Sequence, residues 1–248
     1  MTASDHEPDD HDMPADDGAS AHAHGSFFGR RKGHKLRNHQ ADLIDNLLPH
    51  LALDIGGGPA PSHLTELFEG EIGDVRLEIG FGGGEHLIAE AQAFPKIGFI
   101  GCEPYVNGMA KILTQIEALN IGNIRLYAGD AAELLAWAPP QSMARIDLIH
   151  PDPWPKRRHW KRRFVQDATV AAMARIIKSG GEFRFVSDID DYCAWTLWHL
   201  LRSADFHWMA ERADDWRLPW DGYTMTRYGL KAEREGRVAN YLRFERVD

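Results

Sequence analysis

The segment Pro151-Asp-Pro-Trp154 combines residue types that suit chemistry on a flat heterocycle. It follows the apolar run 146–150, which predicts a buried strand ending in a rigid loop, because each proline fixes φ and donates no hydrogen bond to a sheet. Asp152 supplies a carboxylate and Trp154 an aromatic face. Six cations follow within eight positions, namely Lys156, Arg157, Arg158, Lys161, Arg162 and Arg163. This combination indicates a site that holds a nucleobase beside a phosphate backbone.

A glycine-rich loop follows the first apolar run, 75–79. Gly80, Gly82 and Gly84 are spaced G-x-G-x-G, and Glu78 stands two residues before the first of them. Glycines allow a tight turn at positive φ and a close approach of a ligand to the backbone. The spacing differs from the G-x-G-x-x-G loop that cradles the pyrophosphate of a dinucleotide.

Two more acids follow the next two apolar runs. Glu103 ends the run 97–102, where a carboxylate can accept hydrogen bonds from a ribose or simply face water. Asp130 follows the run 124–127 and could accept from an adenine amino group, cap a helix, or do both. Acids at the ends of successive strands predict a single ligand site.

Apolar runs alternate with helix-length segments along most of the chain, which predicts an α/β fold with a mostly parallel sheet and helices on both faces. Ligands of such sheets bind at the carboxyl ends of the strands. The runs 206–209 and 241–244 are expected at the sheet edge, with an antiparallel arrangement left open. The expected strands are 75–79, 97–102, 124–127, 146–150, 181–186 and 241–244, and the expected helices are 85–94, 106–118, 130–137 and 163–178.

The net charge of −9 is unevenly distributed. Seven acids and no Lys or Arg lie within residues 1–24, so 37 − 7 leaves 30 acids against 28 bases in the rest of the chain. We expect residues 1–25 to form a disordered acidic tail, 26–40 a basic arm that either binds RNA or serves only as a solubilising leader, and 41–248 the catalytic domain. Cys102 and Cys193 are expected to be reduced core thiols without a metal. With no apolar stretch long enough to span a bilayer, we expect a soluble cytoplasmic protein.

From about Arg37 to Glu245 the chain resembles the bacterial tRNA (guanine-N7)-methyltransferases, which have a Rossmann-like class I methyltransferase fold with a seven-stranded sheet. The resemblance rests on the Pro151–Arg163 segment, on Ser187-Asp188-Ile189 and on Thr226-Arg-Tyr228. It implies S-adenosylmethionine as cofactor, tRNA as partner and position 46 of the variable loop as target. It places cofactor contacts on Glu78, Gly80, Gly82, Glu103, Asp130 and Asp152, catalysis on Asp152, and substrate contacts on Lys156, Asp188, Thr226, Arg227 and Tyr228.

One position departs from the family pattern. The family commonly has a glutamate directly after Thr-Arg-aromatic, whereas this chain has Gly229. If that carboxylate helps to hold guanine, its role is missing here or has passed to a neighbour such as Glu233 or Glu235. Asp188 is our candidate for accepting from guanine N1–H and N2–H, with a helix N-cap as the other interpretation.

The remaining cations and aromatic residues allow more than one interpretation. The run from Lys156 to Arg163 is expected to contact RNA phosphates, although it could be a solvated helix start. Trp154 and Trp160 could stack on the base or pack beneath the loop. Five later tryptophans are expected to pack in the core or at a domain edge, namely Trp195, Trp198, Trp208, Trp216 and Trp220.

Two other functions remain to be weighed. The glycine loop and Glu103 would also suit an NAD-dependent oxidoreductase, although the loop spacing and the Pro-Asp-Pro-Trp segment disfavour it. A non-catalytic RNA-binding module with the same fold gains support only from Gly229. The sequence leaves the oligomeric state open.

Overall fold

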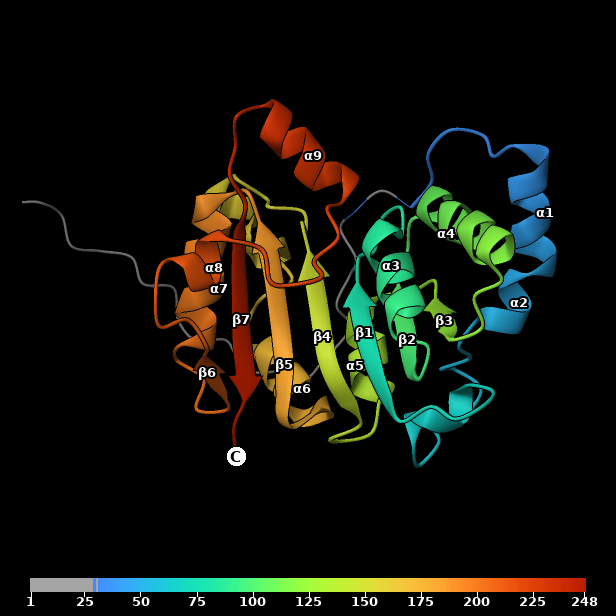
Figure 1. The fold of residues 1–248 in the computed structure, drawn as a ribbon, viewed down its shortest axis with the longest axis horizontal. Coiled ribbons are helices and arrows are strands. Elements are labelled where there is room, and N and C mark those ends of the chain that lie inside the picture. The colour runs from blue at the N-terminus through green and yellow to red at the C-terminus, as the bar shows by residue number, and fades with distance from the viewer. Residues whose placement is uncertain (1–28, 30) are drawn as a thin grey trace, which may run out of the picture.

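The computed structural model describes Gly29 and residues 31–248 (Figure 1). The acidic tail expected at 1–25 and the first residues of the basic arm lie outside the described residues. The described part of the arm lies at the start of α4 (Val106–Leu119), where Arg31 O accepts from Val106 N and Gly33 N donates to Asn107 Oδ1. These two hydrogen bonds attach the described part of the arm to the start of α4.

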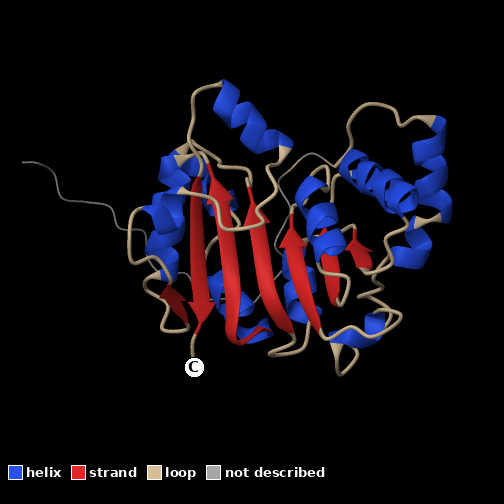
Figure 2. Ribbon diagram, in the orientation of Figure 1, coloured by secondary structure: helices blue, strands red, loops and turns tan. Residues whose placement is uncertain are grey.

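The described chain forms a seven-stranded sheet in the order β3-β2-β1-β4-β5-β7-β6, and the expected α/β fold is confirmed (Figure 2). Five strands are parallel, and β7 pairs antiparallel with both β5 and β6. This antiparallel edge was left open by the sequence. The strands are β1 (Asp74–Ile79), β2 (Ile97–Cys102), β3 (Ile124–Tyr127), β4 (Met143–Ile149), β5 (Ile177–Ser187), β6 (Phe206–Trp208) and β7 (Asn240–Arg246).

Helices pack on both faces of the sheet, as expected. One face is covered by α5 (Ala131–Trp137), α6 (Asp167–Ile176) and α7 (Asp190–Leu200), whose apolar residues form one core with the strands. On the other face, α3 and α4 form a second core with α1 over β2 and β3. The other helical segments are α1 (Asn38–Asn46), α2 (Leu48–Leu51), α3 (Glu85–Ala93), α8 (Asp214–Arg217), α9 (Arg227–Arg234), and the 3-10 helices η1 (Leu64–Leu67) and η2 (Arg157–Arg162).

The helix expected at 163–178 is shorter than the sequence suggested. It begins only at Asp167, because Gln166 has an extended backbone and its N–H donates to Thr169 Oγ1. At the other end Ile177 already belongs to β5 and pairs with Met143. The basic run consequently forms the separate turn η2, not the start of α6.

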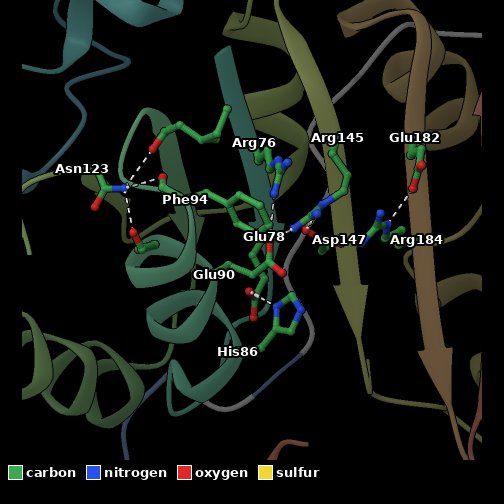
Figure 3. Close-up of polar contacts among 12 residues, drawn as sticks. Arg76, Glu78, His86, Glu90, Phe94, Asn123, Arg145, Asp147, Glu182 and Arg184 are labelled. Atoms are coloured by element: carbon green, nitrogen blue, oxygen red, sulfur yellow. Dashed lines mark hydrogen bonds and ion pairs between the residues drawn. The ribbon is translucent and has the colours of Figure 1, made fainter. Parts of the chain in front are cut away.

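A network of buried charges lies between α3 and the strands β1 and β4 (Figure 3). Glu90 on α3 binds both Arg76 and Arg145, and Arg145 Nε lies 2.8 Å from Asp147 Oδ2. Beside this network His86 Nδ1 lies 2.7 Å from Glu78 Oε2, with both side chains buried. Burial alone would lower the pKa of His86, but the carboxylate of Glu78 outweighs it and raises that pKa to about 9.

The Glu78–His86 pair should make stability depend on alkaline pH. Because the folded pKa of His86, about 9, exceeds its ordinary value of 6.5, the pair stabilises fully below about pH 6.5 and loses this contribution as pH rises through 9. We expect the wild type to lose roughly 2 kcal/mol more than His86→Gln between pH 6.5 and 9.5, measured by urea unfolding. His199→Gln is the matched control, a buried histidine paired with the exposed Asp167. Equal losses in wild type and His86→Gln would contradict the assignment.

Candidate active site

The glycine loop folds tightly at the carboxyl end of β1. Gly80, Gly82 and Gly84 all have positive φ, of 71°, 57° and 83°, which explains their alternating spacing. Their amides bind protein acceptors: Gly80 N donates to Cys102 O, Gly82 N to Glu103 Oε2 and Gly84 N to Phe81 O. These three amides are therefore engaged within the protein and do not form the open anion cradle that a dinucleotide pyrophosphate requires.

Glu103 ties the glycine loop to the start of α4. Its two carboxylate oxygens accept from Gly82 N at 2.8 Å and from Tyr105 N at 3.0 Å, and the side chain is buried. Burial raises its pKa, the two backbone hydrogen bonds oppose this, and the nearby charge of Asp152 raises it further. Each oxygen keeps a second lone pair, so Glu103 can still accept from a ligand. The two expected cofactor acids Glu103 and Asp152 therefore lie close enough to interact.

The ends of β1 to β5 surround a cavity of about 740 Å³, a size typical of small-molecule sites. Asp130 lines it from the start of α5, where its Oδ1 also accepts from Ala132 N at 2.9 Å. The position of Asp130 is thus compatible both with capping α5 and with accepting a hydrogen bond from a ligand in the cavity. The cavity also has these predicted residues in its lining: Gly80, Gly82, Glu103, Asp152, Trp154, Lys161, Arg162, Arg163, Asp188 and Tyr228.

Asp152 projects into this cavity from a strained loop. His150 and Trp154, on either side of it, have positive φ values of 49° and 42°, which non-glycine residues adopt only where the surrounding structure holds them. Partial desolvation by neighbouring protein atoms raises the pKa of Asp152, although the side chain stays accessible from the cavity. Its position supports the predicted role at the reacting atoms.

Glu78 does not reach the cavity, contrary to the expected cofactor contact. Its carboxylate points toward α3 and binds His86, and the residue is only 3% exposed. Burial raises its pKa, while His86 lowers it. Its partner His86 lies on the first turn of α3, directly after the glycine loop. The Glu78–His86 pair therefore connects β1 to the helix that follows this loop.

The basic run divides into an exposed and a buried part. Lys156, Arg157, Arg158 and Lys161 are exposed, whereas Arg162 lies over the ring of Trp154 at 5.0 Å. The expectation that Arg163 contacts RNA is wrong for this structure, because its side chain has no exposed surface. Arg163 instead donates through Nε to Pro153 O at 2.9 Å and pairs with Asp191.

Aromatic rings enclose the Arg163 guanidinium and resolve the open question on Trp160. The rings of Trp160, Tyr192 and Trp195 lie 5.0, 4.9 and 5.2 Å from Arg163 Cζ. Trp160 thus packs beneath the loop, while Trp154 faces the cavity. Trp195, Trp208 and Trp216 pack against the core, and Trp220 contacts Tyr241, but Trp198 is 53% exposed and departs from the packing expected for it.

The segment preceding and opening α9 brings the third motif to the cavity. Thr226 is buried and caps α9 by accepting from Gly229 N at 3.2 Å. A Cβ on Gly82 would lie 3.3 Å from the Tyr228 ring and 3.5 Å from the Arg227 guanidinium, so both side chains cover the glycine loop. Lys156 and Thr226, both predicted substrate contacts, lie outside the cavity lining.

Asp188 is held by two partners the sequence did not identify. Its Oδ1 lies 3.2 Å from His150 Nδ1, and its Oδ2 accepts from Arg237 Nε at 2.5 Å. The suggested substitutes for the missing family glutamate, Glu233 and Glu235, do not line the cavity, and Glu235 pairs with Arg237. His150 could have been noticed as the polar residue that ends an apolar strand, whereas nothing in the sequence marks Arg237.

The described residues contain neither a helix able to cross a membrane nor a group of three or more His, Cys, Asp or Glu placed to hold a metal ion. Both cysteines are buried and unpaired.

Comparison with known proteins places this chain in a family. A family model described as "Putative methyltransferase" matches residues 73–242. A curated tRNA (guanine-N(7)-)-methyltransferase of Bradyrhizobium diazoefficiens is 78% identical over 89% of this chain and 93% of its own length. A protein of the same name from Nitrobacter hamburgensis is 70% identical over 99% of this chain and 97% of its own. Neither an NAD-dependent oxidoreductase nor a non-catalytic RNA-binding module gains support from these matches.

Among solved structures, the 16S rRNA methyltransferase KamB is similar in fold, with a TM-score of 0.51 and 14% sequence identity. The match covers 77% of this chain and 95% of KamB. At this identity the likeness concerns the fold alone, and it confirms the Rossmann-like methyltransferase architecture expected from the sequence.

The two environments in the basic run predict opposite effects of matched substitutions. Arg163→Met should lower the free energy of unfolding by about 1–3 kcal/mol, because it leaves Pro153 O without its donor. Arg158→Met, the control in an exposed position, should change it by no more than about 0.5 kcal/mol. Urea unfolding at neutral pH measures both values. Equal stabilities of the two variants would refute the supporting role of Arg163.

Proposed function

Because the chain belongs to the tRNA (guanine-N(7)-)-methyltransferase family, we propose that it transfers a methyl group from S-adenosylmethionine to guanine N7 in tRNA. The family resemblance points to position 46 of the variable loop as the target. The single observation that carries the proposal is the convergence of Glu103, Asp130 and Asp152 with the glycine loop around one cavity. A tRNA substrate also implies a cytoplasmic enzyme.

The residues of the cavity fit a cationic, adenosine-containing cofactor. Glu103, with a free lone pair on each oxygen, is placed for the ribose hydroxyls, and Asp130 for the adenine edge. Beside the glycine loop, the Glu103 carboxylate occupies the amide of Gly82, which a pyrophosphate site would leave free. When bound, S-adenosylmethionine supplies an activated methyl group on a sulfonium. Negative side chains in a partly desolvated cavity favour such a positive charge.

The reaction places modest demands on acid–base chemistry. Guanine N7 has an available lone pair and needs no base to remove a proton before it attacks the methyl carbon. The protein must align N7 with the transferred methyl and accommodate positive charge as it moves to the purine. Asp152, fixed between two strained backbone positions, provides a negative charge near this path. Its role is electrostatic and orienting.

The exposed cations of η2 and of Lys156, directly before it, form the surface that binds tRNA. Lys156, Arg157, Arg158 and Lys161 lie on the loop that carries Asp152, so phosphate contacts and the reacting base share one rigid segment. The described basic arm lies near the same opening, where Gly29 lines the cavity. Since guanine 46 is engaged in tertiary structure, phosphate contacts must also support its local release before transfer.

Methyl transfer to unmodified tRNA tests the function directly. The expected result is incorporation of labelled methyl and chain cleavage at a single variable-loop guanine after reduction and aniline treatment, which marks 7-methylguanosine. Label without cleavage would reject the N7 assignment. Cofactor binding without label would favour the non-catalytic RNA-binding module.

Asp152→Asn should separate binding from turnover. We expect kcat to fall by about 100-fold or more, because the fixed negative charge is lost while the shape is kept. The dissociation constant for tRNA should change by less than about threefold, because the exposed cations are kept. Asp45→Asn, an exposed acid on α1 away from the cavity, is the control and should retain full activity. Unchanged turnover in Asp152→Asn would contradict the role assigned to this carboxylate.

Neutralising the exposed cations should alter the salt dependence of binding. The double variant Arg157→Gln, Arg158→Gln should bind tRNA more weakly, and the slope of log K against log salt should fall by roughly two, one per lost phosphate contact. Titrations between about 50 and 200 mM salt give the slope. The control pair Lys96→Gln, Arg212→Gln removes two exposed cations elsewhere. An equal slope in both double variants would argue against phosphate contacts by η2.

A further inference from the structure

His150 is an unexplained polar residue at the edge of the cavity. It follows β4 immediately and precedes Pro151 and Asp152, with a left-handed φ of 49°. Its backbone N–H donates to Val186 O at 2.8 Å, which fixes it to β5. Histidine is uncommon in this conformation, so the surrounding structure must hold it in place.

The His150 ring has a defined protonation state. Its side chain is 4% exposed, and burial lowers its pKa below the ordinary 6.5, so the ring is neutral at pH 7. Burial would raise the pKa of Asp188, but the hydrogen bonds from Arg237 and His150 outweigh it, and Asp188 stays ionised. A neutral imidazole facing a carboxylate donates through Nδ1. The other nitrogen, Nε2, is therefore an acceptor.

This acceptor has no hydrogen-bond partner among the described residues. Nε2 is buried and faces Gly229, where an added Cβ would lie only 3.3 Å away. An unpaired buried acceptor destabilises the folded state, because it has lost its hydrogen bonds to water and gained none. Gly229 has no side chain to bind this nitrogen, and Met225, which lies beside Gly229, brings a thioether that cannot donate a hydrogen bond. A ligand with a hydrogen-bond donor could bind Nε2 if the turn formed by Met225–Gly229 moved away.

The covering turn is lightly held. Only Gly229 and Ala232 are buried in α9, and Tyr228 is 49% exposed. In Figure 1, α9 stands above the carboxyl ends of β4 and β5, outside the packed layers. The Met225–Gly229 turn contains the buried Thr226 and Gly229 but no residue of the buried apolar core. Displacing it would open Nε2 to the cavity that His150 and Asp152 both line.

We propose that His150 Nε2 accepts a hydrogen bond from the N1–H or N2 amino group of the target guanine after the Met225–Gly229 turn moves aside. This inference rests on the proposed function and deepens it. Adenine has no donor at N1 or C2, so an acceptor here selects guanine. Asp188, which binds His150 through one oxygen and Arg237 through the other, acts with Arg237 as a positioning residue for the ring.

His150→Asn tests the role of Nε2 in isolation. Asparagine tolerates the left-handed backbone, and its amide can replace the Nδ1 donor to Asp188, but it offers nothing at the Nε2 position. The assay compares tRNAs with guanosine, inosine or 2-aminopurine at the target, since inosine lacks the N2 amino group and 2-aminopurine lacks N1–H. We expect kcat/KM for guanosine to fall by roughly 10-fold or more and one of the two preferences to disappear. Cofactor affinity should be unchanged.

Two further variants separate specificity from general damage. His199→Asn alters another buried histidine that pairs with a carboxylate and has an unpartnered Nε2, but lies outside the cavity lining, and it should keep both preferences. His150→Gln can place an amide oxygen near the Nε2 position and should keep the preference that His150→Asn loses. If both preferences survive in His150→Asn, the proposal is overturned, even if the rate falls. If the wild type forms no 7-methylguanosine, the proposed function itself fails.

Discussion

The loop that carries Asp152 depends on the contacts of the buried Arg163 guanidinium. The guanidinium joins the loop backbone at Pro153 O to Asp191 on α7, and three aromatic rings enclose it. A buried charge is stable only when its donors find acceptors, so the loop has one geometry in which all of these contacts form. The positive φ values of His150 and Trp154 persist because this anchor and β5 hold the loop at both ends.

The same anchor explains how one short segment serves two purposes. Exposed cations lie in η2 and the buried Arg163 directly follows it, so the surface proposed to bind phosphate is attached directly to the structure that positions Asp152. A phosphate contact at this surface would locate the base relative to the carboxylate without a flexible linker between them. Orientation of this kind contributes to rate only where the supporting groups do not move.

Much of the fold could be predicted from the sequence, because apolar runs of strand length alternate with helical segments and each run ends in a recognisable polar residue. The acids Glu103, Asp130 and Asp152 lie at the cavity for this reason. Side-chain direction was not predictable. Six neighbouring cations look alike in sequence, and only packing against Trp160 and Tyr192 distinguishes Arg163. Likewise, the position of Glu78 before the glycines conceals its pairing with His86 on α3.

The electrostatics of the cavity link its cofactor and substrate sides. Burial raises the pKa of Glu103, and Asp152 raises it further, because two carboxylates in a partly desolvated space repel each other. Positive charge between them relieves this repulsion, whether it lies on a sulfonium or on a methylated purine. As the charge moves during transfer, the carboxylates need not move with it. Such a preorganised field lowers the barrier to methyl transfer without the reorganisation that water would require. The strained loop contributes to this field because it holds the Asp152 carboxylate in place.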